Sequence, residues 1–139
     1  MKNYFKTEEF IISPLQRKSK EPIPLSVIDK IWTVHVPILN DMRYNLGAPI
    51  AISKHSGYRS LAWEIDHGRS GTSEHMFDGL GAVDITADNF QALIDLAIQS
   101  EYKRICIYKE DRFIHCDMKG MKRQLFENTD TGWKFIANR

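Results

Sequence analysis

The sequence predicts an α+β domain with a small, mainly antiparallel sheet and helices packed on one side. Two observations carry this prediction. Two stretches repeat apolar residues at helical spacing, and the short apolar runs between and after them have the length of strands. The chain has 139 residues, of which 42% are hydrophobic and 11% aromatic. We therefore expect one domain over residues 1–139 with a substantial core.

The first helical pattern begins near Val27, where apolar residues recur every three or four positions. Ser26 precedes it and is a suitable N-cap. Pro37 falls inside the pattern and should kink or divide the helix, because proline removes a backbone hydrogen bond. Gly47 is suited to end the helix in a left-handed conformation. Residues 13–24, rich in Ser, Lys and Pro, are expected to form an exposed connection.

The rest of the chain predicts one more long helix and several strands. The helix is expected to run from an Asp88 cap to about Ser100, and residues 60–72 should form a partly helical excursion. Residues 104–108 and 113–118 are rich in β-forming side chains, and the four residues between them predict a hairpin. Further strands are predicted at residues 49–53 (buried), 82–85, and 132–136 (a terminal edge strand).

The charge balance gives no bulk attraction to nucleic acid. Lys and Arg number 19 against 18 Asp and Glu, for a net charge of +1. The basic cluster Lys119, Lys122 and Arg123 is a short solvated run. No apolar run approaches the roughly 18 residues of a membrane span. Glu8 and Glu9 stand where a signal peptide is apolar, so we expect cytoplasmic synthesis without an export signal.

The two cysteines, Cys106 and Cys116, are expected to be small buried hydrophobic residues instead of a disulfide. The sequence contains no indication of the oligomeric state, and a monomer is the default expectation.

The first indication of chemistry is Asp84, which stands inside the apolar run Ala-Val-Asp-Ile. A carboxylate flanked by buried strand residues needs a partner, because burying an unpaired charge is unfavourable. A metal ion is one such partner. Gly79 and Gly81 lie just upstream, and they let the backbone turn tightly enough to bring His75 over the strand.

The second indication is His115 in Phe-Ile-His-Cys-Asp. Because strand side chains alternate between faces, His115 and Asp117 should share a face and Cys116 should point away. Two imidazoles, one carboxylate and an open water position form a common catalytic zinc arrangement. Asp117 could orient such a site from behind a ligand. The other histidines, His35, His55 and His67, have no comparable context.

These motifs, taken in order, resemble the M15 family of zinc peptidases, which includes D-alanyl-D-alanine carboxypeptidases, cell-wall endopeptidases and phage endolysins and is related in fold to the Hedgehog signalling domain. The resemblance covers nearly the whole chain. It is carried by Ser73-x-His75, a glycine-containing spacer, Ala82-Val83-Asp84-Ile85, Phe113-Ile114-His115-x-Asp117, Ser56-Gly57-Tyr58-Arg59-Ser60, and the opening Tyr4-Phe5 to Ser13.

The resemblance implies that His75, Asp84 and His115 bind one zinc ion. It also implies that Arg59 points into the site, where its charge could stabilise the oxyanion; a structural ion pair is the alternative. The implied function is hydrolysis of a peptide bond in bacterial peptidoglycan, in phage or prophage lysis or in cell-wall remodelling. Ser73 is expected to brace the loop of His75.

One departure from the family pattern concerns spacing. The family usually places its histidine and aspartate ligands seven residues apart, whereas His75 and Asp84 are nine apart, as if two residues were inserted within residues 76–78. We expect an altered lip on the site. Asp78 in this insert is a possible competing ligand.

A second departure concerns the general base. Many members carry an acid three residues before the last histidine, and Arg112 holds that position here. If the strand extends back to Asp111, alternation places Asp111 on the face of His115, so Asp111 is the favoured base. Glu110 and Asp117 are alternatives. If no acid is positioned, the chain would be a zinc-binding structural or virion-associated module without efficient turnover.

Overall fold

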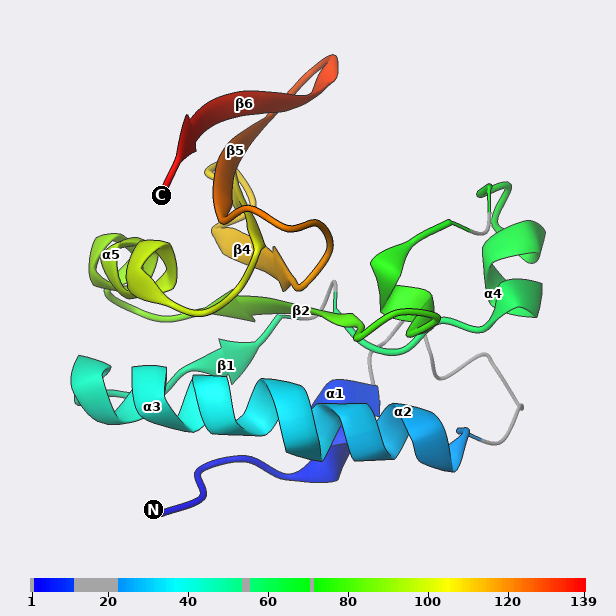
Figure 1. The fold of residues 1–139 in the computed structure, drawn as a ribbon, viewed down its shortest axis with the longest axis horizontal. Helices are drawn as coiled ribbons and strands as arrows, with labels where there is room; N and C mark the ends of the chain where they lie inside the picture. The colour runs from blue at the N-terminus through cyan, green and yellow to red at the C-terminus, as the bar shows by residue number, and fades with distance from the viewer. Residues whose placement is uncertain (1, 12–22, 54–55, 71) are drawn as a thin grey trace.

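The computed structural model describes residues 2–11, 23–53, 56–70 and 72–139, and shows an α+β fold with one six-stranded sheet (Figure 1). Most of the predicted connection 13–24, and His55, lie outside the described residues. Within them, no helix combines the length and apolar character needed to cross a bilayer. The elements run in the order α1 (Thr7–Ile11), α2 (Leu25–Lys30), π-helical turn η2 (Ile31–His35), α3 (Val36–Leu46), β1 (Ala51–Ile52), α4 (Leu61–Asp66), 3₁₀ turn η3 (Glu74–Met76), β2 (Ala82–Thr86), α5 (Phe90–Gln99), β3 (Arg104–Tyr108), β4 (Phe113–Asp117), β5 (Gln124–Thr129) and β6 (Gly132–Asn138).

Helix α2, the π-helical turn η2 and helix α3 follow one another without a gap and form one continuous helix (Figure 1). Pro37 lies in the first turn of α3, where it cannot donate a hydrogen bond to the preceding turn. The wider turn η2 directly before it accommodates this loss, so the predicted interruption near Pro37 takes the form of a π-helical turn within a continuous helix. Gly47 ends α3 with φ 69° and donates to the carbonyl of Arg43, as predicted.

Two predicted caps are wrong by one or two residues. The first helix begins at Leu25 after an extended Pro24, so Ser26 lies inside the helix and is not its cap. Proline fixes φ near the value that a helix start needs, which explains the earlier beginning. In α5 the cap is Asn89, whose side chain accepts a hydrogen bond from the amide of Ala92 at 3.1 Å, and Asp88 precedes it.

The strands follow the order β1-β2-β4-β3-β5-β6, and all neighbours are antiparallel except β3 and β5. The predicted strand at 82–85, the hairpin β3–β4 and the terminal edge strand are confirmed. Strand β5 was not predicted. A strand is present within the predicted range 49–53, but β1 spans only Ala51–Ile52 at the sheet edge. The predicted burial is wrong, because only Ile50 in this range is buried.

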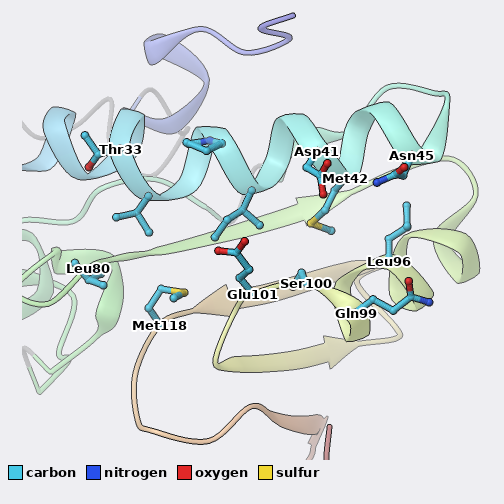
Figure 2. Close-up of a pocket in the computed structure, with 13 residues that line it drawn as sticks. Thr33, Asp41, Met42, Asn45, Leu80, Leu96, Gln99, Ser100, Glu101 and Met118 are labelled. Carbon is cyan, nitrogen blue, oxygen red and sulfur yellow. The ribbon is translucent and has the colours of Figure 1, made fainter. Parts of the chain in front are cut away.

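The two faces of the sheet differ in chemistry. One face packs against α3 and α5 and holds the apolar core, with Val83 and Ile85 from β2 and Ile114 and Cys116 from β4. Alternation sends the intervening side chains, Asp84 among them, to the opposite face. A groove of about 690 Å³ lies on the helical side, between α3 and α5 (Figure 2). None of the predicted site residues lines it.

His35 is a fully buried histidine that links three segments of the core. Its Nε2 lies 2.9 Å from the carbonyl of Leu80 and its Nδ1 lies 2.9 Å from the hydroxyl of Tyr102. A carbonyl only accepts, so Nε2 carries the proton and Nδ1 accepts from Tyr102. Burial lowers the pKa of His35 to about 4. The side chain is therefore neutral at physiological pH and fixes the loop that leads into β2.

The buried neutral state of His35 predicts an acid-dependent loss of stability. Between about pH 6.5 and pH 4 the unfolded chain binds a proton at this residue that the folded chain does not, so the free energy of unfolding should fall by up to about 3 kcal/mol as the pH drops. In His35→Gln the side chain still reaches Leu80 but does not titrate. Urea unfolding in chelator should therefore show a smaller decrease for His35→Gln than for the wild type. Equal decreases would contradict the prediction.

Candidate metal centre

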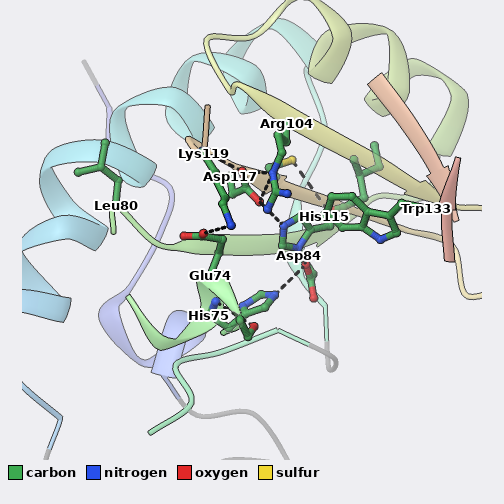
Figure 3. A network of polar contacts seen from close by, with 12 residues as sticks. Glu74, His75, Leu80, Asp84, Arg104, His115, Asp117, Lys119 and Trp133 are labelled. Carbon is green, nitrogen blue, oxygen red and sulfur yellow. Dashed lines mark hydrogen bonds and ion pairs between the residues drawn. The ribbon is translucent and has the colours of Figure 1, made fainter. Parts of the chain in front are cut away.

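His75, Asp84 and His115 converge on one point of the polar face of the sheet (Figure 3). The nearest nitrogens of the two imidazoles lie 3.2 Å (His75 Nε2) and 3.0 Å (His115 Nδ1) from Oδ1 of Asp84. One donor atom from each residue lies within 4.8 Å of the others. The side chains are buried, with 3–7% of each residue exposed. The structure thus brings together the three residues that the sequence singled out as ligands.

The sheet register places two of these residues side by side. Asp84 on β2 is the direct partner of His115 on β4, and side chains of directly paired residues lie on the same face. The third residue, His75, lies in η3, and Ser73 is the N-cap of this turn. The hydroxyl of Ser73 accepts a hydrogen bond from the amide of His75 at 3.2 Å, so it braces the loop as predicted.

The segment Ser56–Ser60 holds both ligand-bearing backbones. The hydroxyl of Ser56 accepts from the amide of Asp84 at 3.0 Å. The amide of Arg59 donates to the carbonyl of His75 at 2.9 Å. Ser60 caps α4 by accepting from the amide of Trp63. This short segment therefore fixes the distance between β2 and η3.

Arg59 lies beside the centre and is only 8% exposed. Burial lowers the pKa of its guanidinium, while the charge of Asp84 acts in the opposite direction. Its guanidinium carbon lies 5.3 Å from the ring centre of Trp63 on α4, which supports it from one side. The structure thus places a fixed positive charge near the ligand carboxylate.

The longer connection between His75 and Asp84 is packed in place. Phe77 adopts a left-handed conformation with φ 59° and its ring is buried against His35 and Tyr58. Lys30 on α2 donates to the carbonyl of Phe77 at 2.7 Å. A Cβ at Gly81 would overlap the Phe77 ring, so only glycine fits there. The predicted altered lip is therefore an anchored turn.

Asp78, within the same connection, was considered as a competing ligand. It is exposed and does not belong to the ligand group found among the described residues.

Behind His115 lies a second row of charged residues. Nε2 of His115 lies 2.7 Å from Oδ2 of Asp117. Asp117 in turn receives hydrogen bonds from Arg104, whose Nη2 donates at 2.6 Å and whose Nε lies 3.0 Å from Oδ1. Burial by itself raises the pKa of Asp117, but His115 and Arg104 lower it to about 2. A charged Asp117 thus fixes the orientation of the imidazole.

The donor atoms fit a metal cation. Nε2 of His115 donates its proton to Asp117. In the neutral imidazole, Nδ1 therefore carries a lone pair, and it lies 3.0 Å from an oxygen of Asp84. Two acceptors at this distance need a proton or a cation between them. Without metal a proton fills this role, because hydrogen bonds from His115 to Asp117 and Asp84 outweigh burial and raise the pKa of His115 to about 9. The imidazoles likewise hold the pKa of Asp84 well below its usual value against the effect of burial.

His75 adds an independent sign of the same fit. Burial lowers its pKa, which favours the neutral imidazole that metal binding requires, and its Nε2 is the nitrogen that faces Asp84. Two nitrogens and one carboxylate oxygen are a donor set that suits zinc.

The acids of the β3–β4 turn are not members of the ligand group. Strand β4 begins at Phe113, and Arg112 adopts a left-handed conformation with φ 54°. The strand alternation that was expected to place Asp111 on the face of His115 therefore does not extend to Asp111. Asp111 and Glu110 are both exposed in the turn. The third alternative, Asp117, is committed to His115, Arg104 and the amide of Lys119.

Two residues of this region were not singled out by sequence reasoning. Arg104 is the register partner of Asp117 across the β3–β4 hairpin, so the predicted hairpin contained the signal. Trp133 on β6 lies with its ring 5.2 Å from the ring of His115, and no local pattern indicated this contact.

Residues 3–117 match the family model described as Peptidase M15. The match includes all three ligands, the Ser56–Ser60 segment and Asp117, and it ends before β5. Comparison with curated proteins gave no match.

The charged row behind His115 predicts that Asp117→Asn weakens zinc binding about 10- to 100-fold, because the orientation of the imidazole is lost. The control is Glu127→Gln, which removes a carboxylate of β5 from a partly exposed ion pair with Lys109 and should leave the affinity unchanged. Competition against a chromogenic chelator measures both. An unaltered affinity in Asp117→Asn would show that this residue does not position the ligand.

The packed turn predicts a large difference between two glycine substitutions with nearly the same backbone angle. Gly81 has φ 87° and faces the Phe77 ring, whereas Gly120 has φ 91° and faces open space. Both alanine variants should lose about 1–2 kcal/mol through left-handed strain, and Gly81→Ala should lose about 1–3 kcal/mol more through overpacking. Urea unfolding in chelator gives the comparison. Equal losses would mean that the turn around Phe77 accommodates the added methyl group without a further loss of stability.

Proposed function

The chain belongs to the peptidase M15 family, and on that basis we propose that it is a zinc-dependent hydrolase that cleaves a peptide bond in bacterial peptidoglycan. The family is zinc-dependent and acts on peptides, so the match supports a metallopeptidase activity. The observation that supports it most directly is the convergence of His75, Asp84 and His115. The proposed ion is a single Zn²⁺ held by these three side chains.

The residues around the centre have separate tasks in this proposal. Zinc held there would lower the pKa of a bound water toward about 7 and would polarise the scissile carbonyl. Asp117 and Arg104 keep His115 in the tautomer that offers Nδ1. Arg59 is close enough to Asp84 for their charges to interact, and it would stabilise negative charge on the carbonyl oxygen. Hydrolysis would add the water oxygen to the carbonyl carbon, break the C–N bond and pass one of the water's protons to the leaving amine.

The peptidoglycan substrate is supported by the likeness of the motifs to cell-wall peptidases. The setting we propose is phage or prophage lysis, or cell-wall remodelling. In the phage setting a protein made in the cytoplasm reaches the wall by release or delivery.

One observation favours a second candidate, a zinc-binding structural or virion-associated module without efficient turnover. Asp111 and Glu110, two of the acids considered as general base, lie in an exposed turn, and Asp117 is fully hydrogen-bonded. Stoichiometric zinc in a protein that cleaves no cell-wall peptide would favour this candidate.

The test compares His115→Ala with the wild type and with His67→Ala. His67 is an exposed histidine whose ring stacks on Trp63, so its removal controls for the loss of an imidazole. Each protein is incubated with purified muropeptides, with and without chelator, and the products are identified by mass spectrometry; bound zinc is measured by elemental analysis. We expect the wild type and His67→Ala to bind one zinc and cleave, and His115→Ala to do neither.

Two results would contradict the proposed zinc mechanism. Cleavage by His115→Ala at the wild-type rate, or cleavage that survives chelation, would refute the zinc mechanism. The product masses identify the bond that is cut.

A further inference from the structure

The hairpin β5–β6 lies beyond the residues that match the family, yet it reaches the metal centre. Strand β5 pairs in parallel with β3, from Arg104 opposite Gln124 to Ile107 opposite Glu127, and β6 returns antiparallel to β5. This pairing carries Trp133 over the polar face of the sheet. Its ring lies 5.2 Å from that of His115 and 4.9 Å from the guanidinium carbon of Arg104 (Figure 3).

Trp133 is held firmly in this position. Its Nε1 donates to the hydroxyl of Tyr108 on β3 at 2.8 Å, and Tyr108 is itself stacked on Phe113 of β4 with ring centres 4.3 Å apart. The centre of its ring also lies 5.4 Å from that of Phe126 on β5. Side chains from three strands thus determine where the indole lies.

The indole therefore covers both ends of the row Arg104–Asp117–His115. The side chain of Asp117 is fully buried, while those of Arg104 and His115 are 23% and 9% exposed. A flat apolar ring over the two ends of this row keeps water from competing for the hydrogen bonds to Asp117, and hydrogen bonds are stronger where water is excluded. The ring face also attracts the guanidinium.

We propose that Trp133 is a positioning residue of the metal centre: it acts through His115 and Arg104 to hold the imidazole in the orientation that binds metal. The hairpin β5–β6 is then part of the site and not an appendage to it. This inference rests on the proposed zinc centre and adds a dependence of metal affinity on a residue outside the family match.

The test uses Trp133→Leu, Trp133→Phe and the control Phe135→Leu in the full chain. Phe135 lies on the same strand, is 49% exposed and contacts Phe126, so its substitution removes an aromatic ring from the hairpin without touching the contacts to His115 and Arg104 described above. Zinc affinity is measured by chelator competition. The visible absorption spectrum of the Co²⁺-loaded protein reports ligand geometry, and unfolding in chelator checks the fold.

We expect Trp133→Leu to weaken zinc binding about 10-fold, the size typical of residues that support a ligand, and to alter the Co²⁺ spectrum. Trp133→Phe should restore part of the affinity, and Phe135→Leu should match the wild type. If Trp133→Leu does not fold, Tyr108→Phe decides, because it removes only the hydroxyl that accepts from the indole; it should weaken binding in the same direction.

Two failures are distinguishable. A wild-type protein that binds no zinc removes the proposed function and this inference together. A wild type that binds zinc, with the folded Trp133 and Tyr108 variants unchanged in affinity and spectrum, removes the inference alone.

Discussion

The structure depends on one buried carboxylate. Asp84 lies in a strand between apolar neighbours, 3% exposed, and an isolated charge there would be strongly unfavourable. The two imidazoles hold its pKa well below the usual range despite burial, so it stays ionised and requires positive charge at one fixed point. Because His75 comes from a loop and His115 from the neighbouring strand, the carboxylate brings two distant parts of the chain to the same place. Ser56 completes this arrangement by binding the backbone of Asp84 itself.

The sequence predicted those parts of the fold that depend on local pattern. The hairpin β3–β4 and helix α5 have clear periods, and Gly47 marked a helix end by its conformational freedom. Strand β5 was missed because its residues are mostly half-buried and mixed in polarity, and because its partner β3 is parallel and distant in sequence. Such pairing leaves no local signal.

In the site, too, local patterns predicted some residues, and contacts between distant segments left others unpredicted. His75, Asp84 and His115 followed from residue type, strand alternation and a family resemblance. The strand alternation expected for Asp111 is absent, because β4 begins at Phe113 and the residue before it, Arg112, has a left-handed backbone. Trp133 could not be predicted at all, since its contact with His115 depends on the parallel pairing of β5.

The position of His75 shows how the fold, and not the ligand residues alone, determines the centre. The connection from η3 to β2 is fixed by Lys30 on α2 through the carbonyl of Phe77 and by His35 on η2 through the carbonyl of Leu80. Both anchors come from the helical layer, on the opposite side of the sheet from Asp84. A ligand on an unsupported loop would lose conformational entropy when a metal bound. Here that ordering is completed when the helices pack, so the stability of the core and the geometry of the metal centre are coupled through two backbone carbonyls.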